Sequence, residues 1–494
     1  MKRKNNKKIF ISIFFAIVFA VFFILPTNHA QAAANIFDGS TDSNWGTAGN
    51  WSLGAVPTAS DGNIATFDAS SPDCTVNASS RVANAIDFTN YTNTITMSYA
   101  ITVSGNITLG ASMNVSGTVA MIASATANLT SNGKTWPAGF IFTGTSQTFT
   151  LIDDWNVDGL LTLAGTTAQT INGFTIYAGG GLTSGTVAVT GTTNLVLNGT
   201  GTWTGGGYIN LNLTINTAGT ITLAGGGNFC RKGTGTLTYT AGTIIDTGIT
   251  LAFSSGATLT LAGYTWNNIS LGGAPTTYTL TNAITTTTLT LSGSGNPVIN
   301  GQSIHATDLI VSSTGINGGT TTIDVSGTWS NSSTGYVTND LTLNTGSTIS
   351  GNVYYRLGTL TVSAGASITV TSSTLTLGAG AIGAILNLNG LTLNNLAINS
   401  TSGSISLTSG LIISGAFTNT DSASHPKILS SVGGTQRVVT LLAGATQNLS
   451  KVDATDIDSS AGQTIRTYNG VLSNTTNWIS TLGGLLTVAY TFVF

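Results

Sequence analysis

Charged side chains are scarce in this sequence. They make up only 6% of the 494 residues, and all 17 acidic residues are aspartate. An ordinary globular domain carries about a quarter charged residues. The shortage excludes a disordered chain, because such chains are rich in charge and poor in hydrophobic residues, whereas 41% of this chain is hydrophobic. It is typical of stacked strands, in which like charges about 4.8 Å apart would repel each other.

Basic residues are also few. Five of the 14 Lys and Arg residues lie within the first eight positions. The remaining nine stand against 17 acidic residues, so the rest of the chain has a net charge of 9 − 17 = −8. Because no basic stripe is present, we expect neither nucleic acid nor an anionic membrane surface as a partner.

Cysteine and proline are rare as well. The two cysteines, Cys74 and Cys230, are too few for the disulfide framework of a small secreted domain. One long-range bridge between them stays open, but their segments are far apart along the repeat described below, which favours free thiols. Only seven prolines occur, and no linker is evident between domains.

The N-terminus has the order of a secretory signal peptide. Basic residues precede an uncharged apolar run over 9–25, and small residues follow as far as Ala32. This order predicts a signal peptide over residues 1–32 and therefore a secreted or cell-surface protein. The alternative is an uncleaved membrane anchor, since the apolar run is near the short limit for spanning a bilayer.

Short apolar-Thr-apolar triplets recur along the rest of the chain, without any sustained helical periodicity. Each triplet places two apolar side chains on one face of a strand and a β-branched polar one on the other. Gly, Asn and Ser supply the turns between them. The triplets are Leu161–Leu163, Leu213–Ile215, Leu237–Tyr239, Leu289–Leu291, Leu341–Leu343 and Leu375–Leu377. They predict an all-β fold.

A longer duplication lies over the triplets. Ala127–Trp136 matches Ala257–Trp266, and the second copy matches 384–393 at a similar further offset. The offset of about 130 residues exceeds one solenoid coil, so we interpret each copy as several coils of about 20 to 25 residues duplicated as a block. The sequence predicts a β-solenoid over 105–415, with blocks at 136–265, 266–392 and, in part, 393–415. A divergent C-terminal segment follows at 416–494.

We interpret the solenoid as a right-handed parallel β-helix, the hand following from the general rule for parallel crossovers. The alternative is a string of β-sandwich domains, but these have about seven strands per roughly 100 residues and linkers between them. The duplication predicts that Trp266 and Leu393 occupy the same phase of the repeat. It also matches Cys230 with Tyr355, which favours a packing role for this cysteine.

The head of the chain carries a more specific pattern. Residues 44–61 read Asn-Trp-Gly-Thr-Ala-Gly-Asn-Trp-Ser-Leu-Gly-Ala-Val-Pro-Thr-Ala-Ser-Asp, and Phe67-Asp68 follows. This segment resembles the opening segment of bacterial β-helical surface proteins, including autotransporter passengers. The resemblance implies an N-terminal cap, which with the first coils spans 33–104. The chain departs from autotransporters because no C-terminal barrel pattern is visible. Its alternating end, 486–494, predicts a final capping or pairing strand.

Two acidic clusters are the candidates for chemistry. Asp153, Asp154 and Asp158 can supply paired carboxylates for glycoside hydrolysis or ligands for Ca²⁺, with Trp155 as a platform for a sugar ring. Adjacent strand residues point to opposite faces, however, so these acids need a bulge or turn to converge. The matching segment one copy later, 282–285, lacks acids.

The second cluster is a set of candidate metal ligands, Asp453, Asp456 and Asp458, of which the last two can share a face. The order of a Ca²⁺ loop is missing, so solvated turn carboxylates are the alternative. His305 and His425 have no visible partner in the sequence. Since no zinc-ligand spacing or phosphate loop occurs, we expect no cofactor and assign no catalytic residue.

These observations favour an exported structural or adhesive surface protein, an extended spacer that binds glycans or proteins through its wall. The alternative is a polysaccharide lyase or glycoside hydrolase on a β-helix, since fold alone implies no activity. An enzyme of that kind needs converging acidic and basic residues, and nine basic residues make such a groove hard to assemble.

Overall fold

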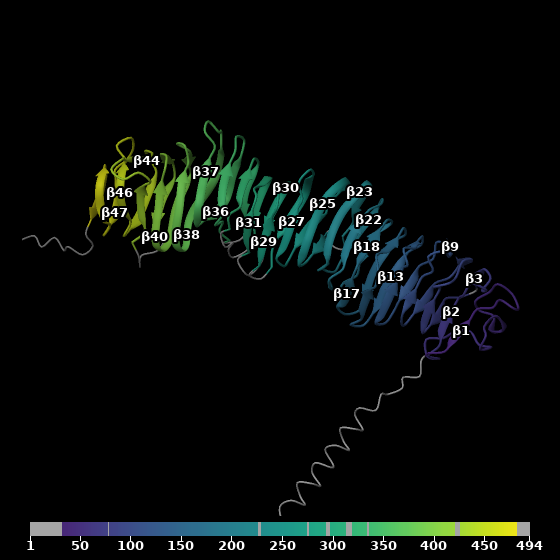
Figure 1. The fold of residues 1–494 in the computed structure, drawn as a ribbon. Coiled ribbons are helices and arrows are strands. Elements are labelled where there is room, and N and C mark those ends of the chain that lie inside the picture. Colours follow the sequence, from purple (N-terminus) through teal and green to yellow (C-terminus); the bar gives the residue numbers. More distant parts are fainter. Residues whose placement is uncertain are drawn as a thin grey trace, which may run out of the picture.

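The computed structural model describes residues 32–77, 79–225, 229–273, 276–292, 297–312, 319–332, 335–419 and 425–481. Across these ranges the chain is nearly all β, with 49 strands and one short 3-10 helix, η1 (Ala48–Asn50). The strands wind into a parallel β-solenoid of about 18 turns, one elongated body in Figure 1. The predicted all-β parallel solenoid is confirmed, and a string of sandwich domains is excluded.

The predicted signal peptide, residues 1–32, lies outside the described residues except for Ala32. The predicted capping or pairing strand at 486–494 lies outside them entirely. Within the described part of the chain, no helix combines the length and the apolar character needed to cross a membrane.

One coil contains three short strands. The coil that begins with β13 (Phe140–Gly144) continues with β14 (Thr148–Leu151) and β15 (Trp155–Val157). The next coil lies on it in parallel register, and Phe140 pairs with Leu161 at the start of that coil. The step from Phe140 to Leu161 agrees with the predicted coil length of about 20 to 25 residues.

Inward and outward side chains alternate along the strands, as the triplets predict. In β16 (Leu161–Gly165), Leu161 and Leu163 are fully buried, and Thr162 between them is half-buried on the outer wall. Inward side chains of successive coils form one continuous apolar core. Each buried Leu, Ile or Val contributes roughly 1.5–3 kcal/mol relative to an exposed position, so the core holds the stack together.

The three strand positions of a coil form three faces, which we number 1 to 3. In the N-terminal half, face 1 contains β4 (Arg81–Ala83), β7 (Ile101–Val103), β10 (Met121–Ala123), β13, β16, β19 (Gly181–Ser184) and β22 (Gly201–Gly205). Face 2 contains β1 (Ala34–Ile36), β2 (Ile64–Thr66), β5 (Ala85–Asp87), β8 (Ile107–Thr108), β11 (Ala127–Thr130), β14, β17 (Gln169–Gly173) and β20 (Val189–Thr190). Face 3 contains β3 (Cys74–Val76), β6 (Thr94–Met97), β9 (Asn114–Gly117), β12 (Thr135–Trp136), β15, β18 (Thr175–Ala178) and β21 (Asn194–Leu197).

In the C-terminal half many strands run round a corner and belong to more than one face. These longer strands are β23 (Asn212–Leu223), β25 (Gly235–Ile245), β28 (Thr265–Leu271), β30 (Ile284–Leu291), β32 (Ile304–Val311), β36 (Thr348–Tyr355), β38 (Thr369–Asn387), β40 (Asn395–Leu407) and β46 (Asp453–Asp458). The shorter strands up to residue 393 are β24 (Phe229–Lys232), β26 (Thr250–Phe253), β27 (Ala257–Thr260), β29 (Thr277–Leu280), β31 (Val298–Gly301), β33 (Thr322–Val325), β34 (Thr328–Asn331), β35 (Asp340–Leu343), β37 (Leu357–Val362) and β39 (Thr392–Leu393).

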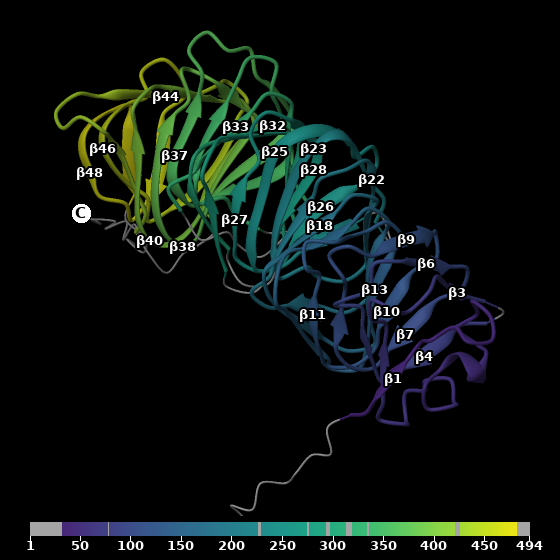
Figure 2. The same cartoon turned by 45° about the vertical axis from the view of Figure 1, so that its right-hand side comes forward.

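The solenoid continues through the segment predicted as divergent. There, β40 pairs in parallel with two strands beyond residue 415, β42 and β43. The strands of this end are β41 (Leu411–Ile413), β42 (Ala416–Asn419), β43 (Lys427–Ser430), β44 (Arg437–Leu441), β45 (Thr446–Ser450), β47 (Ile465–Tyr468), β48 (Leu472–Thr476) and β49 (Trp478–Thr481). Figure 2 shows them stacked beyond β38 in the same direction as the preceding coils.

The duplicated blocks do not return to the same face. Leu129 lies on β11 in face 2, whereas its match Leu259 lies on β27, which continues the face 3 column through β25, β23 and β21. Trp203 lies on face 1, and its match Trp329 pairs with Leu309 on face 2. Each block therefore spans several whole coils plus one further strand.

This register corrects the expected equivalence of Trp266 and Leu393. Both side chains are buried, so the alternation of inward and outward positions is the same. Trp266, however, lies in the face 1 part of β28 and pairs with Thr286, whereas Leu393 lies on β39, the face 2 strand of its coil. Inward positions on all three faces are apolar, so a sequence match does not fix the face.

The head segment closes the N-terminal end of the solenoid, where β1 and β2 lie in Figure 1. The rings of Trp45 and Trp51 lie 4.9 Å apart, and Trp51 also lies 5.3 Å from Phe37 and 5.6 Å from Phe67. The Trp51 Nε1–H donates to the Trp45 carbonyl at 2.8 Å. This aromatic plug covers the apolar edge of the first coil, as the predicted cap requires.

A group of side-chain hydrogen bonds fixes the loop that contains Trp45 and Trp51. Buried Asn50 accepts hydrogen bonds from the backbone N–H groups of Thr41 and Asp42, both at 2.9 Å, and donates to the Asp42 carboxylate at 2.6 Å. Hydrogen bonds from the Asn44 N–H, then from the Asn50 amide, lower the pKa of Asp42 to about 2. The Asn-Trp pairs of the head thus form this cap through side-chain hydrogen bonds and ring packing.

One lysine points into the core. Lys232 is fully buried on β24, between Ile209 of the preceding coil and Phe253 of the next. Its Nζ donates to the carbonyl of Thr234. Burial lowers the pKa of Lys232 to about 7, because the charged form loses its hydration.

We expect Lys232→Met to stabilise the coils around β24. Because the folded pKa is lowered, the unfolded chain binds one more proton between pH 7 and 10.5, and the wild-type free energy of unfolding rises with pH in that window. The gain from pH 7 to pH 9 is about 2–3 kcal/mol, since one pKa unit is worth about 1.4 kcal/mol. Hydrogen exchange at β24 and β26 amides measures it. The variant should lose this pH dependence, whereas Lys427→Met, at an exposed position, should retain it.

Candidate functional site

The first acidic cluster is used by the backbone of neighbouring coils. The Asp153 carboxylate accepts hydrogen bonds from the N–H groups of Ser131 at 2.7 Å and Asn132 at 2.6 Å, and the Asp154 carboxylate accepts one from the Thr175 N–H at 2.9 Å. Asp153 binds the coil before it and Asp154 the coil after it. Asp158 is exposed at the end of β15. Two of the three acids therefore link coils through turn hydrogen bonds.

Trp155 is not a sugar platform. Its side chain is fully buried in the core, and its ring lies 5.1 Å from that of Phe140. All eight tryptophans of the chain are buried: Trp45 and Trp51 lie in the head plug, and the other six occupy inward positions of strands. Among the described residues, the aromatic side chains exposed by more than a third are Tyr99, Phe174 and Tyr468. The sequence contained no signal that separates inward from outward aromatics outside clear triplets.

The second acidic cluster is split by the backbone. Asp456 has a left-handed φ of 56°, which interrupts the alternation of β46, so that Asp456 is buried and Asp458 remains half-exposed. The expectation that these two share a face is therefore wrong. A hydrogen bond from the Asn474 amide, then one from the Gly434 N–H at 2.9 Å, lowers the pKa of Asp456. Asp458 caps its own turn through the Ser460 N–H at 2.8 Å.

No group of three or more His, Cys, Asp or Glu residues suited to a metal ion occurs among the residues that the structure describes. Asp453 is held by two different partners. Its Oδ1 accepts from the Val471 N–H at 2.7 Å and lies 3.1 Å from His425 Nδ1. This corrects the expectation that His425 has no partner.

His305 also has partners, on the outer wall of face 1. It pairs directly with Asp324 in the parallel register of β32 and β33, and His305 Nδ1 lies 2.8 Å from Asp324 Oδ2. On the other side of the ring, Nε2 lies 3.1 Å from the hydroxyl of Ser303. Sequence reasoning could have found this contact, because His305 and Asp324 are separated by nearly one coil length and occupy outward positions of their strands.

A cavity of about 150 Å³ opens beside this group. Its lining is mainly hydroxyl and amide side chains, together with the imidazole and the carboxylate: Thr265, Thr285, Thr286, His305, Ala306, Thr307, Asp324, Ser326 and Asn344. His305 is about half exposed, with a side-chain accessibility of 49%, and Asp324 is less so at 22%. The group is therefore reachable from solvent and adjoins a polar hollow.

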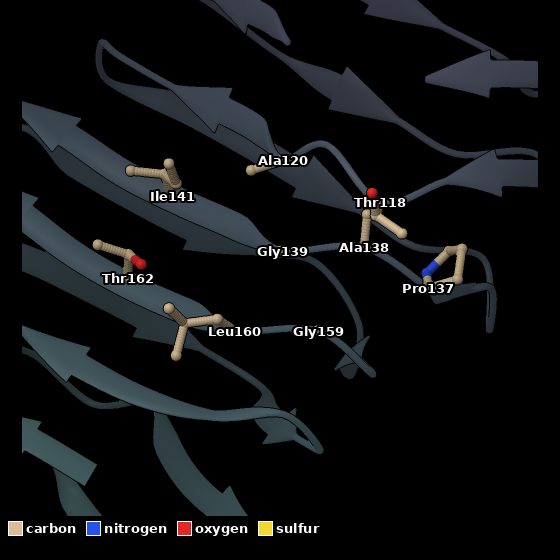
Figure 3. A pocket seen from close by; sticks show the side chains of 9 residues that line it. All are labelled: Thr118, Ala120, Pro137, Ala138, Gly139, Ile141, Gly159, Leu160 and Thr162. Carbon is tan, nitrogen blue, oxygen red and sulfur yellow. The ribbon is translucent and has the colours of Figure 1, made fainter. Parts of the chain in front are cut away.

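A larger hollow of about 360 Å³ lies at the start of β10, β13 and β16 (Figure 3). Its lining contains no titratable side chain: Thr118, Ala120, Pro137, Ala138, Gly139, Ile141, Gly159, Leu160 and Thr162. Its glycines mark close backbone approach, since a Cβ at Gly159 would lie 2.3 Å from the Ala138 carbonyl carbon. Without a titratable group beside its two threonine hydroxyls, this hollow has no general acid or base.

Both cysteines are free and buried. Burial raises the pKa of both thiols, that of Cys230 to about 12. The Cys230 Sγ–H donates to the Trp203 carbonyl at 3.4 Å. The packing role predicted for Cys230 is confirmed, and neither thiol is a reactive nucleophile at neutral pH.

Small polar residues form a continuous ladder along face 2. Successive parallel pairs place them one above another from β26 to β38, in the column Thr250, Asn268, Thr288, Asp308, Thr328, Thr348 and Thr369. A second column two residues further along the strands contains Ser270, Thr290, Ser330 and Ser350, with the apolar Ile310 between Thr290 and Ser330. We call these two columns the face 2 ladder. At about 4.8 Å per coil, the seven coils span about 29 Å.

No protein-family model, curated protein or solved structure matches this chain.

Proposed function

We propose that the chain is an exported structural or adhesive protein of the cell surface, a stiff spacer whose outer wall binds neutral glycan chains or protein partners. The observation that carries this proposal is the unbroken parallel stack with its single core and its polar outer ladder. An extended wall of repeated hydroxyl and amide groups offers many weak hydrogen bonds to an extended partner, and their effects add up along its length.

The composition of the wall supports neutral partners over charged ones. The first column of the face 2 ladder contains one charged residue, Asp308, whose Oδ1 accepts from the Thr328 N–H at 2.7 Å. Elsewhere, the carboxylates of Asp153 and Asp154 accept backbone hydrogen bonds, and those of Asp324 and Asp453 each lie beside a histidine. A lyase or glycoside hydrolase stays the alternative function, and its predicted acids Asp153 and Asp154 link coils through hydrogen bonds instead of facing each other across a groove.

We expect the double change Thr328→Val and Thr348→Val to weaken binding to neutral polysaccharides about tenfold. Each change removes one hydroxyl and keeps the side-chain shape, and a hydrogen bond contributes about 0.5–1.5 kcal/mol. Binding to a panel of immobilised neutral and acidic polysaccharides measures the effect. The matched control is Thr236→Val with Thr258→Val on face 3, where hydroxyls are equally half-buried.

Equal losses for the two double variants would show that the face 2 ladder is not the binding surface. Absence of binding by the wild-type protein to every polysaccharide and to whole cells would reject adhesion and leave only the spacer role.

A further inference from the structure

We propose that Ser303, His305 and Asp324 form a hydrolytic site for small acyl esters of polyhydroxylated molecules, such as O-acetylated glycans. The three residues make one chain of contacts in the order that acyl transfer requires. Asp324 Oδ2 lies 2.8 Å from His305 Nδ1, and His305 Nε2 lies 3.1 Å from Ser303 Oγ. This site is separate from the proposed adhesive wall on face 2.

The solenoid register brings the three groups together. His305 and Asp324 are paired residues on neighbouring strands of face 1, so their side chains leave the wall side by side. Ser303 precedes inward-facing Ile304, which places the serine on the same outer side as His305. The neighbouring positions of this column, Thr285 and Thr342, carry only hydroxyl groups. The histidine and aspartate thus interrupt an otherwise uncharged column at two adjacent coils.

The contacts define the role of each residue. The Asp324 carboxylate accepts the Nδ1–H of His305 and holds that tautomer, which leaves Nε2 as an acceptor for the Ser303 hydroxyl proton. Ser303 is then the nucleophile, His305 the general base and Asp324 a positioning residue. The second described pair, His425 and Asp453, is arranged differently, because the Asp453 oxygen beside His425 also accepts the Val471 N–H.

The reaction needs only the ester and water. Ser303 Oγ forms a bond to the ester carbonyl carbon as its proton moves to His305 Nε2, and the bond to the alcohol breaks as that oxygen takes the proton. Water then loses a proton to Nε2 and attacks the acyl-serine, and the carboxylic acid leaves as Ser303 regains its proton.

The adjoining cavity indicates the substrate class. At about 150 Å³ it is small, and Thr265, Thr285, Thr307 and Asn344 surround it with hydroxyl and amide groups. Such a lining suits the hydroxyls of a sugar ring on the alcohol side of the ester. Since the contact between Ser303 and His305 is exposed to solvent, a small acyl group such as acetyl can reach the nucleophile without a lid.

The test combines active-site labelling with turnover of p-nitrophenyl acetate and O-acetylated xylan by the full chain. A fluorophosphonate probe should modify Ser303, identified by peptide mass spectrometry, and Ser303→Ala should lose both the label and the turnover. His305→Ala should lower kcat about 100-fold or more, and added imidazole should restore part of it. Asp324→Asn should lower kcat at unchanged KM, which a merely structural role would not do.

Two controls decide between this site and a background reaction. The first control is His425→Ala, which removes the histidine of the other His-Asp pair, and the second is Ser146→Ala, at an exposed serine. Both variants should leave labelling and turnover unchanged. Turnover that survives Ser303→Ala but not His305→Ala would show simple imidazole catalysis and overturn the proposal. Absence of both label and turnover in the wild-type protein would overturn it as well. Thr328→Val with Thr348→Val should leave turnover unchanged, so failure here is distinct from failure of the adhesive function.

Discussion

Deletion of residues 265–386 is expected to leave a folded rod that is shorter by about 29 Å, because it removes six coils of about 4.8 Å each. A continuous column of pairs connects the two ends of the cut, from Thr265 through Thr285, His305, Asp324, Thr342 and Thr361 to Asn387. Asn387 therefore takes the place of Thr265 six coils earlier, on the same face and with the same outward direction. Small-angle scattering measures the length.

The duplicated block itself, 266–392, is the matched control, because it is similar in size but ends one face later. Its removal joins Thr265 on face 1 to Leu393, which lies on the face 2 strand of its coil. Inward positions still meet inward positions, so we expect the remaining coils to stack, but the C-terminal part should be turned by one face relative to the N-terminal part.

Spin labels report that turn. Labels at Thr250 on β26 and Ile412 on β41 lie on face 2. They should be closer in the 265–386 deletion than in the 266–392 deletion. The native cysteines are buried and should not take up the label. Unfolding of the 265–386 deletion, or equal label distances in the two variants, would contradict the register described here.

Trp45→Ala is expected to loosen the N-terminal end of the solenoid by about 3–5 kcal/mol, the usual cost of removing a buried tryptophan side chain. Trp45 is fully buried, and its ring lies 4.9 Å from Trp51 and 5.4 Å from Phe67. Removal opens the plug that covers the first coil. Because each coil of a solenoid contacts mainly its neighbours, the loss should be local and not global.

Hydrogen exchange locates the effect. Amides of β1, β2 and β5 should lose protection, whereas those of β44 to β46 at the far end should keep it. Exposure of the first strands also leaves an apolar edge with unpaired backbone groups, so light scattering should detect end-to-end association. Leu53→Ala, in the same loop but 50% exposed, is the control and should change neither measurement. Equal loss of protection at both ends would show that the rod unfolds as one unit.

The sequence predicted those features of the fold that depend on a few consecutive residues or on a repeat. Alternation is a property of three consecutive residues, so Leu161, Thr162 and Leu163 alone predicted a strand with one inward and one outward side. The duplicated block of about 130 residues predicted several coils of about 20 to 25 residues, and the scarcity of charge predicted stacked strands. The head pattern around Trp45 and Trp51 implied a cap through its resemblance to the opening segment of β-helical surface proteins. These features are local or repeated, and the structure confirms the all-β parallel solenoid that they predict.

The tertiary structure alone decided which residues meet. His305 and Asp324 are separated by nearly a whole coil, and only the lengths of the intervening turns bring them into register. Trp155 could face either way until its strand was placed, and Asp456 left the outer wall because one left-handed residue interrupts the alternation. The sequence also did not predict on which face each duplicated block begins, because the same triplet can form a strand on any of the three faces. Parallel pairing acts across a whole coil, and the sequence of one strand does not contain the register of the next.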